Sequence, residues 1–117
     1  MATLLILSDS PYGSERSFNG LRLASALQKD QTPGAVRVFL LSDAVTCALP
    51  NQLRPEGASN VEQMLTELLA SGAEVKACMT CVDQRGLFKL SLIQGVQIGS
   101  MAELAAWTQS SERVITF

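Results

Sequence analysis

Two cysteines three residues apart, Cys78 and Cys81, are the side chains of this 117-residue chain best suited to chemistry. The thiolate form of cysteine is a nucleophile, and its reactivity follows its pKa and its exposure. The pair comes after a short predicted strand, 74–77, and just before Asp83, where we expect a brief helix to begin. We expect a thiol at such a strand end to be open to solvent, and the N-terminus of a helix favours the thiolate. The working thiol is therefore predicted to lie in the segment 78–81.

Basic side chains near the pair strengthen this prediction. Lys76, Arg85 and Lys89 are close to it in sequence, and a nearby positive charge lowers the pKa of a thiol. The two cysteines can instead be small interior residues, since free cysteine is often buried. A thioredoxin-type redox pair has the same spacing, but it opens a longer helix after the first strand, whereas this pair follows the third. We interpret the remaining cysteine, Cys47, as a packing residue.

Tyr12 and Gly13 belong to a second polar segment, 10–14, which precedes a predicted helix. The amides at a helix N-terminus attract anions, so this turn is a weak candidate for binding phosphate. It has neither a G-x-G-x-x-G pattern nor a Walker lysine. Tyr12 and Gly13 either line the rim beside the cysteines or simply form the turn.

The chain contains no histidine, which excludes a Ser-His-Asp or Cys-His pair and a histidine metal ligand within one chain. Three cysteines bind zinc only with a carboxylate or a second subunit, so we expect no metal site. Net charge is -2 and no basic run occurs, which argues against direct nucleic-acid binding. The apolar run 4–7 is too short for a signal sequence, and nothing approaches the roughly 20 apolar residues of a membrane span. We expect a cytoplasmic protein with no membrane segment and with reduced cysteines.

Short apolar runs alternate with longer segments of helical periodicity. This alternation predicts an α/β fold, a three-layer α/β/α sandwich around about five mainly parallel strands, in a single domain. The predicted helices start at Ser14, Asn60 and Ser100, and we place Trp107 and Met101 of the last one in the core. The predicted strands are 3–8, 36–41, 74–77, 96–98 and 113–117, and we expect the last to be tied into the sheet through Phe117.

The loops at the carboxyl ends of parallel strands form the ligand-binding edge of such a sheet. Three segments are predicted to meet there, and they are 9–13, 42–57 and 78–85. The part from 49 to 59 is long for so small a domain, and long loops are commonly functional or form interfaces.

Four separated motifs together resemble one family, the DsrE/DsrF-like sulfur-relay family, and most of all its YchN-like branch. The resemblance covers essentially the whole chain as a single DsrE-like domain, 1–117. The motifs are Ser10-Pro11-Tyr12-Gly13-Ser14, Phe39-Leu40-Leu41-Ser42-Asp43-Ala44-Val45, the segment 75–86 with Cys78, Cys81 and Arg85-Gly86, and the ending 104–117 with Trp107.

The resemblance implies a doubly wound fold, a ring-like homo-oligomer (a trimer, or a hexamer of two trimers) and a role in sulfur relay. A cysteine accepts sulfane sulfur from a donor protein as a persulfide and passes it to an acceptor. In the related tRNA 2-thiouridine relay subunit, the transferring cysteine occupies the position of Cys78. That subunit has no counterpart of Cys81, whereas the YchN-like branch carries both. Cys78 is therefore expected to be the carrier and Cys81 a resolving or supporting thiol.

Arg85 and the loop amides would hold the anionic persulfide, and this chemistry requires no metal or organic cofactor. Two other functions remain open. The chain is a non-catalytic oligomeric binding or assembly module with its cysteines at subunit contacts, or it is a thiol redox switch that forms a Cys78–Cys81 disulfide.

Overall fold

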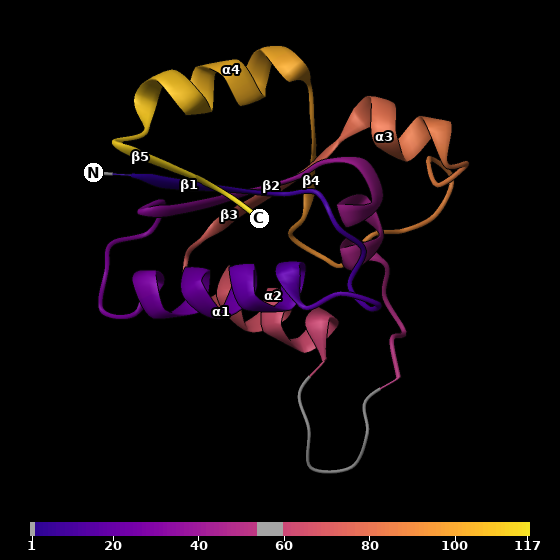
Figure 1. Ribbon diagram of the computed structural model, residues 1–117, viewed down its shortest axis with the longest axis horizontal. Coiled ribbons are helices and arrows are strands. Elements are labelled where there is room, and N and C mark those ends of the chain that lie inside the picture. Colours follow the sequence, from indigo (N-terminus) through magenta and orange to yellow (C-terminus); the bar gives the residue numbers. More distant parts are fainter. Residues whose placement is uncertain (1, 54–59) are drawn as a thin grey trace.

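A five-stranded parallel sheet forms the middle layer of the protein in the computed structural model, which describes residues 2–53 and 60–117 (Figure 1). All four strand pairs are parallel, as predicted, and the strand order is β4-β3-β2-β1-β5. The strands are β1 Thr3–Leu7, β2 Val36–Leu40, β3 Glu74–Cys78, β4 Gln97–Gly99 and β5 Arg113–Thr116.

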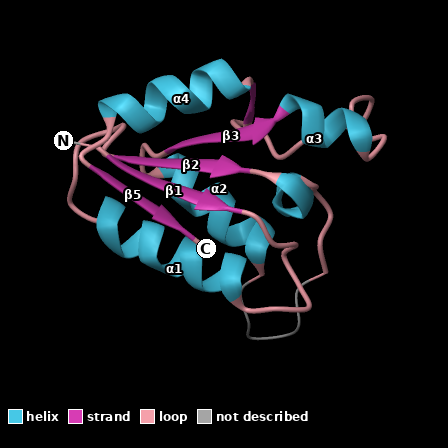
Figure 2. Cartoon of the chain, turned by 45° about the horizontal axis from the view of Figure 1, so that its top comes forward, coloured by secondary structure: helices cyan, strands magenta, loops and turns pink. Residues whose placement is uncertain are grey.

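Helices cover both faces of the sheet, which confirms the predicted three-layer sandwich. Helices α1 (Arg16–Gln28) and α2 (Val61–Ala70) lie on one face, and α4 (Met101–Ser110) lies on the other (Figure 1). Helix α3 (Met79–Gln84) and the 3-10 helix η1 (Ser42–Ala48) lie at the end of the sheet toward which the strand arrows point (Figure 2). No helix among the described residues is long and apolar enough to cross a membrane.

The interior strands β1 and β2 are the most completely buried part of the sheet. Leu4, Leu5 and Leu7 of β1 are fully buried, as are Phe39 and Leu40 of β2. Such continuous apolar strands are expected where helices cover both faces of a parallel sheet. The sequence therefore dictates which strands take the middle of the sheet.

Helix α4 packs on the sheet through Leu104 and Trp107, and the Trp107 ring meets the Phe39 ring edge-on with the centroids 6.2 Å apart. The prediction that Met101 belongs to the core is wrong, because its side chain is 61% exposed. Met101 is the first residue of α4 and directly follows the edge strand β4, so no further strand covers it.

Two of the predicted helix starts are confirmed and two are displaced. Asn60 caps α2 by accepting a hydrogen bond from the Gln63 amide, and Ser100 forms a capping box with Glu103. Helix α1 begins at Arg16 rather than at Ser14. The helix after the cysteine pair begins at Met79, four residues before the predicted start at Asp83.

The C-terminal Phe117 is tied into the sheet as predicted. Its amide donates to the Ile6 carbonyl at 2.9 Å, and its own carbonyl accepts from the Ser8 amide at 3.2 Å. Its ring lies against Gly20 of α1, where an added Cβ would lie 3.2 Å from the Phe117 ring and 2.5 Å from Leu7 Cδ2. The absence of a side chain at position 20 therefore allows α1 to pack closely on β1.

We predict that Gly20→Ala lowers the free energy of unfolding. Alanine favours a helix interior by about 1 kcal/mol, but overpacking a filled core costs about 1–3 kcal/mol, so the net loss is expected to reach about 2 kcal/mol. Denaturant unfolding measures it, and Ser25→Ala at an exposed position of the same helix is the control, expected to be neutral or slightly stabilising. A Gly20→Ala variant as stable as the control would contradict the packing.

Candidate functional site

The loop after β2 and the helix after β3 meet at the carboxyl edge of the sheet. The Ser42 amide donates a hydrogen bond to Cys81 Sγ at 3.1 Å, and Arg85 forms an ion pair with Asp43. Strands β2 and β3 are parallel neighbours, so η1 and α3 start side by side. The predicted convergence of segments 42–57 and 78–85 is therefore confirmed for residues 42–53 and 78–85. The rest of the first segment, 54–57, lies outside the described residues.

Cys78 is the last residue of β3 and occupies the N-cap position of α3. The expectation of a solvent-open thiol here is wrong, since Cys78 is 4% exposed. Strand β3 is paired on both sides, with Cys78 opposite Gly99 of β4, and α3 begins at the very next residue. The Cys78 side chain accepts no capping hydrogen bond from α3.

Cys81 lies one helical turn later and is partly exposed. Its sulfur faces η1, where the Ser42 amide reaches it. Ser42 has a φ of 52°, in the left-handed region that residues other than glycine rarely adopt. The other non-glycine residues with positive φ in the described part of the chain are Asp30 and Asn51, which tolerate this conformation better. The amide that serves Cys81 is thus held by a locally unfavourable backbone.

Arg85 fixes the position of α3 relative to η1. Its Nε and Nη2 both lie 3.0 Å from Asp43 Oδ1, and its Nη1 donates to the Cys81 carbonyl at 3.1 Å. This guanidinium therefore ties the residue after Ser42 to the backbone of Cys81. The Arg85 side chain therefore holds the Ser42 amide and Cys81 Sγ close to each other.

The pKa of Cys81 is raised above its ordinary value, first by burial and next by a hydrogen bond with the Cys78 thiol. The Ser42 amide and the Arg85 guanidinium act in the opposite direction and lower it. Cys81 therefore interacts directly with the Cys78 thiol, and Cys81 holds its proton more tightly than an isolated cysteine does. A negative charge that develops on Cys81 would be stabilised by the Ser42 amide and the Arg85 guanidinium.

The other basic residues near the pair have different partners. Lys76 pairs with Glu103 of α4 and lies 4.8 Å from the centre of the Trp107 ring, and Lys89 lies over the Phe88 ring. Arg85 alone of the three predicted cations acts on Cys81.

The Tyr12 hydroxyl donates to Gln52 Oε1 at 2.7 Å and accepts from the Val61 amide at 3.3 Å. Tyr12 therefore joins the loop after β1 to the loop after η1 and to the start of α2. Gly13 has a φ of 104°, which explains a glycine in this turn. No recorded contact within the described residues joins Tyr12 or Gly13 to Cys78 or Cys81.

Cys47 is fully buried, in agreement with its interpretation as a packing residue. Burial raises the pKa of this thiol to about 12. No group of three or more cysteine, aspartate or glutamate residues within 2–53 and 60–117 is placed to hold a metal ion.

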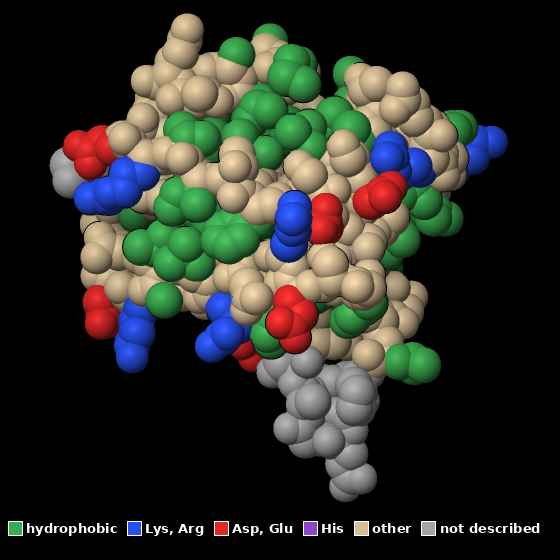
Figure 3. Space-filling view, in the orientation of Figure 1, with side chains coloured by type: hydrophobic (Ala, Val, Ile, Leu, Met, Phe, Trp, Pro, Cys, Tyr) green, Lys and Arg blue, Asp and Glu red, His purple; other side chains and the backbone are tan. Residues whose placement is uncertain are grey.

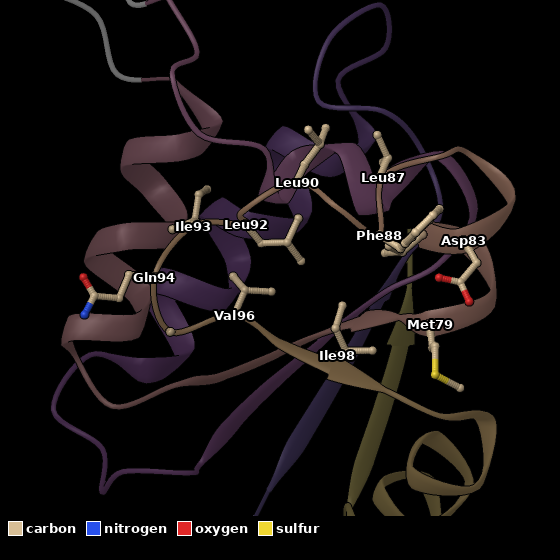
Figure 4. Close-up of a pocket in the computed structure, with 12 residues that line it drawn as sticks. Met79, Asp83, Leu87, Phe88, Leu90, Leu92, Ile93, Gln94, Val96 and Ile98 are labelled. Carbon is tan, nitrogen blue, oxygen red and sulfur yellow. The ribbon is translucent and has the colours of Figure 1, made fainter.

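Sequence reasoning missed a pocket of about 340 Å³ beside α3. Figure 4 shows side chains of α3, of the segment that follows it and of β4 gathered around this space. The signal was the apolar content of the segment 87–96, which reads as a loop but carries five large apolar residues before Val96. Phe88 and Leu90 there are 62% and 53% exposed, so the pocket opens onto an apolar surface.

The profile of the DsrE/DsrF-like family matches residues 1–117. The chain belongs to the DsrE/DsrF-like family. It is 48% identical to protein YchN of Escherichia coli over 114 residues, which cover 97% of both chains. The crystal structure of that protein superposes on this one with a TM-score of 0.90 over the full length of both chains.

More distant proteins match this chain in sequence or in fold. An uncharacterised protein of Methanopyrus kandleri is 36% identical over 97% of this chain and 91% of its own length. A protein of unknown function from Methanobacterium thermoautotrophicum, 16% identical, has a TM-score of 0.77 with full coverage of both chains, which shows a common fold. The DsrE/DsrF-like resemblance inferred from the sequence motifs is thus confirmed.

For this DsrE/DsrF-like chain we predict that the alkylation rate of Cys81 rises with pH and has its midpoint above that of an unperturbed cysteine, because its pKa is raised. Cys78→Ala should move the midpoint down, since it removes a neighbour that raises the pKa of Cys81. Arg85→Gln should move it up, since the guanidinium lowers that pKa. Iodoacetamide labelling followed by peptide mass spectrometry measures all three.

Cys47 is the internal control in that experiment, because its pKa of about 12 and its burial leave it unlabelled in the folded protein. A Cys81 midpoint that stays unchanged in both variants would show that neither the Cys78 thiol nor the Arg85 guanidinium acts on this sulfur.

Proposed function

We propose that this protein is a sulfur carrier that accepts sulfane sulfur as a cysteine persulfide and passes it to an acceptor. Cys78 is the carrier in this proposal and Cys81 is its supporting thiol. The observation that carries it is the contact of two thiols at the carboxyl edge of the sheet, with the Ser42 amide and the Arg85 guanidinium beside them. Membership of the DsrE/DsrF-like family supports the same role.

The transfer needs only the thiols of this chain and a persulfide donor. A thiolate attacks the outer sulfur of the donor persulfide, R–S–SH, and a new sulfur–sulfur bond forms on the cysteine. The donor's own sulfur–sulfur bond breaks and R–S⁻ leaves with its electron pair. No net oxidation or reduction occurs, so the reaction requires no cofactor.

A persulfide is an anion near neutral pH, and the site offers two groups that favour an anion. The amide of Ser42 points at Cys81, and a fixed amide donor stabilises negative charge more strongly in a partly desolvated site than in water. The Arg85 guanidinium adds a positive charge beside it. Tyr12 and Gly13 act at one remove, by shaping the loops that form the rim.

We further propose that the chain works as a homo-oligomer, a trimer or a hexamer. Exposed apolar side chains at both edges of the sheet support this, because such surface is usually covered in an assembly. Ile98 of β4 is 45% exposed and Val114 of β5 is 42% exposed. Figure 3 shows apolar side chains gathered over the region of β5.

A thiol redox switch is the second candidate, and the contact between Cys78 and Cys81 favours it. Two thiols within hydrogen-bonding reach can form a disulfide after a small movement, given an oxidant.

Incubation with inorganic polysulfide, followed by mass spectrometry of the intact folded chain, tests the first function. We expect the mass of one added sulfur atom, located by peptide mapping to the segment 78–81 and removed by dithiothreitol. The double variant Cys78→Ala/Cys81→Ala should take up none, although it keeps Cys47. Cys47→Ala is the matched control and should load like the native chain.

A native chain that takes up sulfur only after unfolding would contradict the carrier function. A Cys78–Cys81 disulfide under mild oxidation, with no sulfur adduct, would favour the switch instead.

A further inference from the structure

We propose that sulfur is received first by Cys81 and is then handed inward to Cys78, so that Cys81 is a catalytic residue of the first transfer. This inference rests on the proposed carrier function and adds an order of events to it. It reverses the simplest expectation, in which the donor reaches Cys78 directly.

Access is the first argument. Attack by a thiolate on a sulfur–sulfur bond is in-line, so the donor must approach the sulfur along an open direction. Cys78 is 4% exposed and is enclosed by β2, β4 and the start of α3. Cys81 is partly exposed, and its sulfur accepts the hydrogen bond from the Ser42 amide. A donor arriving from solvent therefore meets Cys81 first.

The second argument is the backbone of Ser42. A serine with a φ of 52° is in a disfavoured backbone conformation, and strained residues of this kind gather at functional sites. Here the strained residue is the one whose amide donates to Cys81 Sγ at 3.1 Å. The Cys78 side chain accepts no capping hydrogen bond from α3. The anion-stabilising group of the site is thus directed at Cys81.

The Arg85 clamp is the third argument. It pairs with Asp43, next to Ser42, and donates to the carbonyl of Cys81. The same guanidinium lowers the pKa of Cys81. Arg85 therefore links the backbone of Cys81 to Asp43 of η1 and fixes its position there, in addition to lowering its pKa.

The hand-over follows from the contact between the two thiols. The Cys78 thiolate attacks the outer sulfur of the Cys81 persulfide, a sulfur–sulfur bond to Cys78 forms, and the bond to Cys81 Sγ breaks. Cys81 leaves as a thiolate and takes up the proton that Cys78 lost. Sulfur is conserved and nothing is oxidised. The persulfide then lies on the buried sulfur, where small thiols in solution reach it slowly.

Time-resolved loading with inorganic polysulfide tests this order in the full-length chain. The adduct should appear on Cys81 before Cys78 in the native chain. Cys78→Ala should load at Cys81 at least as fast as the native chain, because loss of the Cys78 thiol lowers the pKa of Cys81. Cys81→Ala should load at Cys78 at least about ten-fold more slowly than the native chain loads, because access to a buried thiol limits the reaction. Thermal unfolding of each variant checks that it is folded.

A pair of variants at Ser42 tests the strained amide without touching either cysteine. Ser42→Gly keeps the amide and adopts the left-handed backbone at no steric cost, so it should load faster than a variant that disfavours this backbone. Ser42→Val disfavours that backbone at an exposed position, so loading of Cys81 should slow several-fold.

Loading of Cys81→Ala at the native rate would overturn the proposed order while leaving the carrier function intact. Equal rates in the two Ser42 variants would also overturn the role of the amide. Loss of sulfur uptake in the native chain itself would instead refute the carrier function, so the two failures are distinguishable.

Discussion

The hydrogen bond from the Ser42 amide to Cys81 Sγ joins the two loops that make the site. It exists because β2 and β3 are parallel neighbours, so the residues after both strands emerge at the same edge. The ion pair of Arg85 with Asp43 holds the two loops at the required separation. The sheet therefore positions the Ser42 amide against Cys81 Sγ. This position requires the left-handed backbone conformation of Ser42.

The predicted fold agrees with the structure because its signals are long and redundant. The apolar run in β1 has no polar interruption, as expected for a strand covered on both faces, and β1 is an interior strand between β2 and β5. The alternation of strands and helices then predicts parallel strands joined by right-handed crossovers. With the direction of the strands given, the convergence of the loops after β2 and β3 follows from topology alone.

The details of the site depend on features that a residue pattern does not encode. The start of α3 at Met79 rather than Asp83 moves Cys78 from an open loop to a buried strand end, and no strong capping residue at Cys78 announces this start. The φ of Ser42 is invisible in sequence, because serine is not a residue type typical of that conformation. The exposure of Met101 reflects the short edge strand beside it. The sequence thus predicts which candidate residues lie at this edge of the sheet, but it does not predict their relative exposure.

We propose that the Ser42 amide stabilises negative charge on Cys81. A nuclear magnetic resonance titration of isotope-labelled protein measures this interaction directly. The account predicts that the Ser42 amide proton shifts downfield over the pH range in which Cys81 ionises, since a thiolate is a stronger acceptor than a thiol. The shift should vanish in Cys81→Ala. A Ser42 amide signal that stays still while Cys81 titrates would contradict the account.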